Sequence, residues 1–184
     1  MALDYRQIAN GGKAFFTIGF SFINTKGHPI GPILIPYYVN LSFACELFMK
    51  AIIVYYRDDI TIGQLRGLGH DLFRLYISLP KVIQQEIEER IPDSEVKKRT
   101  EELLREYKIR LAGDPPVDEK LILERKISNP PTTFIEMLKT HSDIFEKWRY
   151  YYEAVANSPI FCDEWFLSYF SSSLHNILGR IMSK

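Results

Sequence analysis

The stretch that decides the fold is residues 37–57, YYVNLSFACELFMKAIIVYYR. Its apolar residues recur at spacings of three and four, which is the period of one helix face, and such a face must be buried against other helices. Glu46 and Lys50 lie four residues apart in the order that favours an ion pair. Asn40 or Ser42 is expected to cap the start of this helix. The residues of the predicted buried face are Ala44, Leu47, Phe48, Ala51, Val54 and Tyr55.

The composition predicts one domain spanning residues 1–184, long enough to bury a single core without disulfides or a metal. With 46% hydrophobic and 14% aromatic residues, the chain is not typical of disorder. Its 23 basic and 23 acidic residues give a net charge of zero, so no overall field draws the protein toward nucleic acid. A local basic patch remains compatible with this balance.

Cys45 and Cys162 each lie inside an apolar helical pattern, away from any metal-ligand spacing. We interpret both as small buried hydrophobic residues in a reducing cytoplasm, and we expect neither a metal nor a cofactor. The N-terminus lacks the pattern of a secretory signal. Residues 32–56 are apolar but contain Pro36, Glu46 and Lys50, which argue against a membrane span.

Other helical patterns fill most of the chain, separated by connectors rich in glycine and proline at 24–36 and by a second connector at 59–69. Residues 117–127 are ambiguous between strand and helix, and we interpret the region from about 111 to 131 as an inserted arm. Because strand signals are nearly absent, the sequence predicts an all-α antiparallel up-and-down bundle. The predicted helices are Asp4–Ile23, Gly69–Leu79, Pro80–Ile91, Ser94–Arg110, Thr132–His141, Ser142–Ala156 and Phe161–Met182.

Two glycines at positions 11 and 12 precede Lys13, but the remainder of a phosphate-binding loop is missing. A helix irregularity or a close helix contact is the favoured interpretation.

Three segments, taken in order, resemble the HEPN (higher eukaryotes and prokaryotes nucleotide-binding) family. These are FACELFMKAIIV with Glu46 and Lys50, GHDLFRLYISLP with His70 and Asp71, and FEKWRYYYE with its Arg-Tyr pair at 149–150. The resemblance covers roughly Asp4 to Glu153, and residues 97–131 and the C-terminal helix look like additions. It implies a four-to-five helix bundle, commonly dimeric, in proteins connected with RNA cleavage, toxin and antitoxin pairs, phage defence or nucleotidyltransferase partners.

The chain departs from the catalytic members of that family, in which an arginine precedes a histidine by about four to six intervening residues on one helix. No arginine here has this spacing; the nearest, Arg66, has three residues before His70. If the protein is an enzyme, the only candidates for metal-independent RNA cleavage are His70, His141 and Arg149, because imidazole can transfer protons and guanidinium can bind phosphate.

Each candidate also has a structural interpretation. His70, together with Asp71, could organise the start of a helix. Arg149 could bind phosphate, stack on the neighbouring rings or pair with Glu46. Tyr150 and Tyr152 could stack on bases or form part of the core or a dimer interface.

The leading hypothesis is therefore a non-catalytic HEPN-like protein that binds nucleotide, RNA or a protein partner in a stress or defence context. The candidate ligand-binding residues are Glu46, Lys50, Asp71, Arg149, Tyr150 and Tyr152. A metal-independent endoribonuclease acting at a dimer cleft and a plain oligomerisation scaffold are the alternatives. The aromatic final helix favours a homodimer, and a nucleotidyltransferase is a further partner that the resemblance suggests.

Overall fold

The computed structural model describes residues 3–23, 34–113, 120, 124, 127–144 and 163–183. Within these residues the chain is mostly helical and contains no strand, which confirms the predicted all-α class. The helices are α1 (Tyr5–Ser21), α2 (Leu34–Tyr56), α3 (Ile62–Gly67), α4 (Leu72–Ile77), α5 (Lys81–Arg90), α6 (Asp93–Ala112), α8 (Phe134–Thr140) and α11 (Glu164–Met182).

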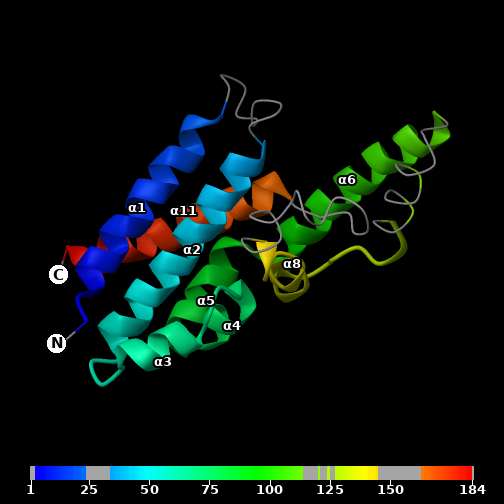
Figure 1. Ribbon diagram of the computed structural model, residues 1–184. Helices are drawn as coiled ribbons and strands as arrows, with labels where there is room; N and C mark the ends of the chain where they lie inside the picture. The colour runs from blue at the N-terminus through cyan, green and yellow to red at the C-terminus, as the bar shows by residue number, and fades with distance from the viewer. Residues whose placement is uncertain are drawn as a thin grey trace.

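Helix α2 is the centre of the bundle and contacts α1, α11 and α4 (Figure 1). The sequence predicted one buried face, but α2 is buried on several sides because these three helices pack around it. Buried side chains therefore include Cys45, Met49 and Ile52 besides the predicted residues. Leu47 and Tyr55 of the predicted face are only half-buried.

The start of α2 differs from the prediction. The helix begins at Leu34, so Pro36 lies in its first turn, where the missing N–H of proline has no helical partner to lose. Neither predicted cap is at the helix start. The Asn40 side-chain amide donates to the Pro36 carbonyl, and the Ser42 hydroxyl donates to the carbonyl of Val39, both inside the helix.

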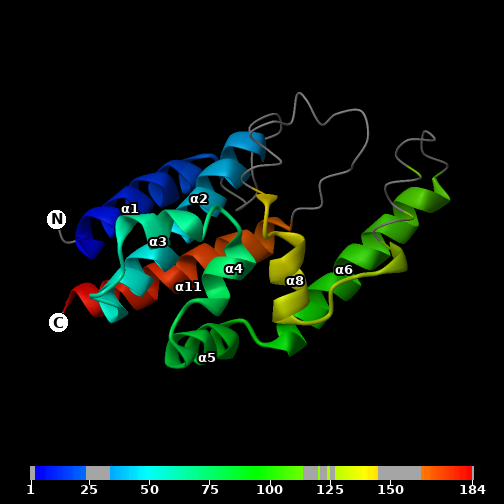
Figure 2. The same ribbon diagram turned by 60° about the horizontal axis from the view of Figure 1, so that its bottom comes forward.

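Helices α1 and α2 lie side by side along most of their length (Figures 1 and 2). Gly12 and Gly19 allow this close approach. A Cβ atom added at Gly12 would lie 2.6 Å from Cδ1 of Phe48, and one added at Gly19 would lie 2.6 Å from Cδ2 of Leu41. The predicted close helix contact is thus confirmed.

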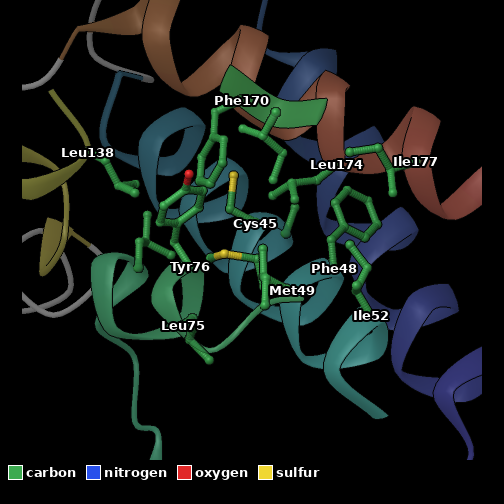
Figure 3. Close-up of a cluster of buried hydrophobic side chains, with 14 of the residues drawn as sticks. Cys45, Phe48, Met49, Ile52, Leu75, Tyr76, Leu138, Phe170, Leu174 and Ile177 are labelled. Atoms are coloured by element: carbon green, nitrogen blue, oxygen red, sulfur yellow. The ribbon is translucent and has the colours of Figure 1, made fainter. Parts of the chain in front are cut away.

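The remaining core joins α2 to α4, α8 and α11 (Figure 3). Tyr76 of α4 and Phe134 of α8 meet with ring centroids 5.3 Å apart, and Phe170 of α11 lies 5.8 Å from Phe134. Cys45 is buried in this core, as predicted, and its burial raises the pKa of the thiol far above the usual value. Cys162 lies outside the described residues.

The starts of helices α3 and α6 correct the sequence analysis. The predicted connector at 59–69 contains α3, whose start is a capping box in which Thr61 and Gln64 each bond the other's backbone N–H. Helix α6 begins at Asp93, so Ser94 lies inside it, and the carboxylate of Asp93 instead accepts a hydrogen bond from Phe134 N at 2.7 Å. Asp93 thereby ties the start of α8 to α6.

The other helices agree with prediction to within a few residues at their ends. Helix α11 begins at Glu164 rather than Phe161, after the N-cap Asp163. Most of residues 117–127 lies outside the described chain, as does the predicted helix beyond Ile144. Within the described chain, α2 alone is long and apolar enough to cross a membrane. Of its most apolar 18-residue stretch, 72% is buried inside the bundle.

Candidate functional site

Glu46 and Lys50 of the mainly apolar helix α2 form a polar cluster with His70, which lies in the turn between α3 and α4. We call this the Glu46 cluster. One carboxylate oxygen of Glu46, Oε1, accepts a hydrogen bond from Lys50 Nζ at 2.7 Å. The other, Oε2, lies 2.8 Å from Nδ1 of His70. The glutamate side chain is 2% exposed, whereas the lysine is 12% and the histidine 37% exposed. A buried carboxylate therefore holds two basic side chains that reach the surface to different degrees.

The local sequence explains how the histidine reaches the glutamate. Lys50 is one helical turn after Glu46, so both project from the same side of α2. His70 arrives from the turn between α3 and α4, where Gly69 has a φ of +71° that side-chain-bearing residues rarely adopt. After the turn, the Asp71 carboxylate accepts from Arg74 N at 2.8 Å and caps α4. The turn is thus fixed on both sides of the imidazole.

The predicted role of Asp71 as a helix cap is confirmed by this bond, while His70 is directed to Glu46 instead. Leu72 N donates to the carbonyl of Ser142 at 2.8 Å, which brings the turn that follows α8 against the start of α4. The His70 turn and the His141 turn are therefore neighbours in space.

The Glu46 cluster has the chemistry of a small anion site. A lysine ammonium has three N–H donors, and Lys50 uses one on Glu46 with no other acceptor among the residues that the structure describes. The carboxylate also fixes the ring of His70 through Nδ1, which sets the direction in which Nε2 points. Lys50 can thus offer further charged N–H donors to a ligand while Glu46 holds the side chain in place.

His141 is the second histidine that the sequence analysis predicted as a site residue, and unlike His70 it is completely buried. Its side chain is 0% exposed, Nδ1 lies 2.8 Å from the Met137 carbonyl, and Nε2 accepts from Asp163 N at 2.8 Å. Burial lowers the pKa of this imidazole, against smaller raising effects of the Met137 carbonyl and Asp163. Because both ring nitrogens are engaged inside the core, His141 is placed to join α8 to α11 and not to meet a substrate.

The sequence analysis missed the partners of His141. Asp163 caps α11 through its Oδ1, which accepts from Phe166 N at 2.9 Å, and its Oδ2 lies 3.5 Å from Nε of Arg99 on α6. His141, Asp163 and Arg99 are here called the His141 junction. An aspartate two residues before an apolar helical run is a recognisable cap signal, but nothing local marks Arg99 as its partner.

His175 on α11 was also missed. Its ring stacks on Phe16 of α1 at 4.8 Å and lies 5.7 Å from Phe48 of α2. Partial burial, followed by the nearby Lys13, lowers the pKa of this imidazole. The residue lies at the contact of three helices, where the sequence showed only an unremarkable polar position.

An acidic hollow of about 730 Å³ lies where α5, α6 and α8 meet. Glu88, Glu89 and Asp93 line it, but Tyr76 donates its hydroxyl proton to Glu88 and Asp93 caps α8, so two of the three carboxylates have structural partners. Burial, followed by Glu88, raises the pKa of Tyr76 far above its usual value. Among the residues that the structure describes, no three histidine, cysteine, aspartate or glutamate side chains are placed to bind one metal ion.

Arg149, Tyr150 and Tyr152, the remaining predicted site residues, lie outside the described residues. Of the predicted set, the fold therefore brings together Glu46, Lys50 and His70, with Asp71 next to them. In comparisons with protein-family models, curated proteins and solved structures, the chain matches none.

Proposed function

We propose that this chain is a non-catalytic, HEPN-like helical protein that binds a phosphate-bearing ligand, a nucleotide or RNA, at the Glu46 cluster, in a stress or defence context. The observation that carries the proposal is the placement of Lys50 and His70 on one buried carboxylate, both with access to solvent. The resemblance of three sequence segments to the HEPN family supplies the ligand class.

The physical argument is that folding already holds the basic side chains in place before a ligand binds. Burying a lone carboxylate is expensive, and Glu46 compensates this cost by pairing with two basic groups. Once held in this way, Lys50 and His70 lose little further side-chain entropy when an anion arrives. Charge-assisted hydrogen bonds to phosphate are among the stronger polar contacts in proteins. An anionic ligand is thus better suited to this cluster than a neutral one.

The test is binding of a fluorescently labelled single-stranded RNA, measured by anisotropy, with unlabelled nucleotides as competitors. Lys50→Gln can still donate to Glu46 but removes the charge, and we expect it to weaken binding about tenfold or more. Lys98→Met, an exposed lysine on α6, is the matched control and should bind like the wild type. Equal affinity of Lys50→Gln and wild type, with both folded, would exclude the Glu46 cluster as the site.

A second candidate is a metal-independent endoribonuclease, and one observation favours it. A buried carboxylate that holds a half-exposed imidazole through Nδ1 is the arrangement by which enzymes orient a general base. Cleavage of a mixed RNA in excess EDTA by wild type, but not by His70→Ala or Arg149→Ala at matched folding, would establish this activity and retire the non-catalytic proposal.

The proposed assembly is a homodimer, with a nucleotidyltransferase as a further protein partner to be tested. Light scattering coupled to size exclusion decides the oligomeric state. A dimer that binds no RNA, nucleotide or partner protein would leave the oligomerisation scaffold as the working function.

A further inference from the structure

The His141 junction has a feature that its structural role does not require. His141 is completely buried, and its two ring nitrogens contact backbone groups of opposite kind: the Met137 carbonyl at Nδ1 and the Asp163 N–H at Nε2. A carbonyl can only accept and a backbone N–H can only donate. The imidazole must therefore be neutral, with its proton on Nδ1 and a lone pair on Nε2.

This geometry makes the junction intolerant of a second proton. Protonating Nε2 would set its new N–H against the N–H of Asp163, so that the 2.8 Å hydrogen bond becomes a repulsive contact. The Asp163 N–H would then be buried without an acceptor, which is unfavourable for a backbone donor. The bond between the end of α8 and the start of α11 is therefore conditional on a neutral ring.

An acceptor for the acid form lies on the same residue. Asp163 uses Oδ1 to cap α11, but Oδ2 is buried and has no hydrogen-bond partner in the described part of the chain. The Arg99 Nε atom, 3.5 Å away, is likewise buried and makes no hydrogen bond. Among the described residues, this carboxylate oxygen is therefore held by its ion pair with Arg99 alone, and it keeps a lone pair for a hydrogen bond from a protonated imidazole.

We propose that the His141 junction is an acid-operated switch between two hydrogen-bonding states. In the neutral state the Asp163 N–H donates to Nε2 of His141. In the acid state Nε2–H donates to the Asp163 carboxylate, and the backbone bond that joins α8 to the first turn of α11 is broken.

The charges around the ring are consistent with this direction. Asp163 on α11 attracts the protonated ring, and Arg99 on α6 faces that carboxylate and is itself paired with Glu102 at 3.5 Å. On α8, the helix that ends at His141, Nζ of Lys139 lies over the ring of Phe73, 4.9 Å from the ring centroid. Desolvation opposes the acid form, so the switch operates below the ordinary titration range of histidine.

The switch has a path to the rest of the molecule. Ser142, next to His141, accepts the 2.8 Å hydrogen bond from Leu72 N at the start of α4. A displacement of the turn at 140–143 therefore acts on the turn that carries His70. The proposal itself concerns the packing of α8 and α11 and does not depend on any ligand of the Glu46 cluster.

The test uses ring ¹⁵N chemical shifts of the full chain, with backbone hydrogen exchange in the first turn of α11, between about pH 7.5 and the onset of acid unfolding. At neutral pH we expect an unprotonated Nε2 on His141. On acidification Nε2 should become protonated while the bundle stays folded, and exchange at residues 163–166 should rise about tenfold beyond the intrinsic pH effect, equivalent to about 1.4 kcal/mol.

Two variants separate the switch from general acid loosening. His141→Gln keeps an acceptor for the Asp163 N–H but does not titrate, so its exchange at 163–166 should follow only the intrinsic pH effect. Asp163→Asn keeps the cap and removes the acid-state carboxylate, and should move protonation of His141 to lower pH. A ring that stays neutral until global unfolding would overturn the proposal. So would an unchanged protonation midpoint in Asp163→Asn, which decides the matter if His141→Gln does not fold.

Discussion

The Glu46 cluster and the His141 junction each hold one histidine by neighbouring polar groups, but they differ in access to water. His70 is 37% exposed and bonded through Nδ1 to a carboxylate, whereas His141 is 0% exposed and bonded through both nitrogens to the backbone. A solvent-accessible histidine can contact a ligand, whereas a completely buried histidine can contact only the residues packed around it. The comparison therefore supports the proposed ligand site at the Glu46 cluster and a structural role for His141.

The largest expected effect tests this division through stability. His141→Ala removes two buried hydrogen bonds and leaves a cavity, so we expect a loss of about 3–5 kcal/mol in the free energy of unfolding. His70→Ala should lose only about 1–2 kcal/mol, because water can replace part of its bond to Glu46. Urea unfolding followed by circular dichroism measures both, and the denaturant slope checks that each variant still unfolds in two states.

Similar losses for the two alanine variants would contradict the comparison. They would mean that His70 is as structural as His141, and the Glu46 cluster would then lose its claim as a ligand site.

The next effect concerns pH and adds His175, which is intermediate in burial. The folded chain holds the pKa values of His141 and His175 below the ordinary value of 6.5. Below that value the unfolded chain binds protons that the folded chain does not, so the free energy of unfolding falls as pH falls. From about pH 7.5 to 5.5 we expect the free energy of unfolding to fall, with a larger contribution from the completely buried His141 than from the partly buried His175.

Thermal melts across this range, repeated with His141→Gln and His175→Gln, separate the two contributions. Each variant should flatten the pH profile, and His141→Gln should flatten it more. A profile that neither variant changes would place the acid sensitivity elsewhere in the molecule.

The fold was largely predictable from sequence because its signals are local. Helical spacing located α2 and α11, and Asp71 was recognisable as a cap next to its own helix. Even the missed helix α3 carried a local signal in the pair Thr61 and Gln64. The extent of burial around α2 and the bond from Phe134 N to Asp93 required knowledge of the packed bundle.

The candidate site was only partly predictable because its bonds are not local. Glu46 and Lys50 were paired from their spacing, but His70 is 24 positions from Glu46 and was expected to cap a helix. The bond from Asp163 to His141 spans 22 positions. Such pairs depend on how the helices pack against one another, and the sequence pattern does not indicate which distant residue will be the partner. The roles of Arg149, Tyr150 and Tyr152 stay predictions because these residues lie outside the described part of the chain.

The smallest effect is expected at the surface, where Glu86 of α5 accepts hydrogen bonds from Arg180 of α11 and from Arg90. Partial burial acts to raise the pKa of Glu86, but the two arginines outweigh it and hold the pKa below 4.5. The stabilisation from this cluster is complete above pH 4.5 and is lost as pH falls through the lowered pKa of Glu86.

Arg180 is 54% exposed, so Arg180→Gln should reduce the free energy of unfolding by only about 0.5 kcal/mol at neutral pH and low salt. That cost should vanish in about 1 M NaCl, because salt screens exposed pairs, whereas the cost of His141→Ala should persist. Arg90→Gln is the matched control, since Arg90 pairs with Glu86 within α5 and joins no second helix. A loss for Arg180→Gln that equals that of His141→Ala and survives salt would show that solvent access does not rank the polar contacts of this bundle, and the distinction between its two histidines would fall with it.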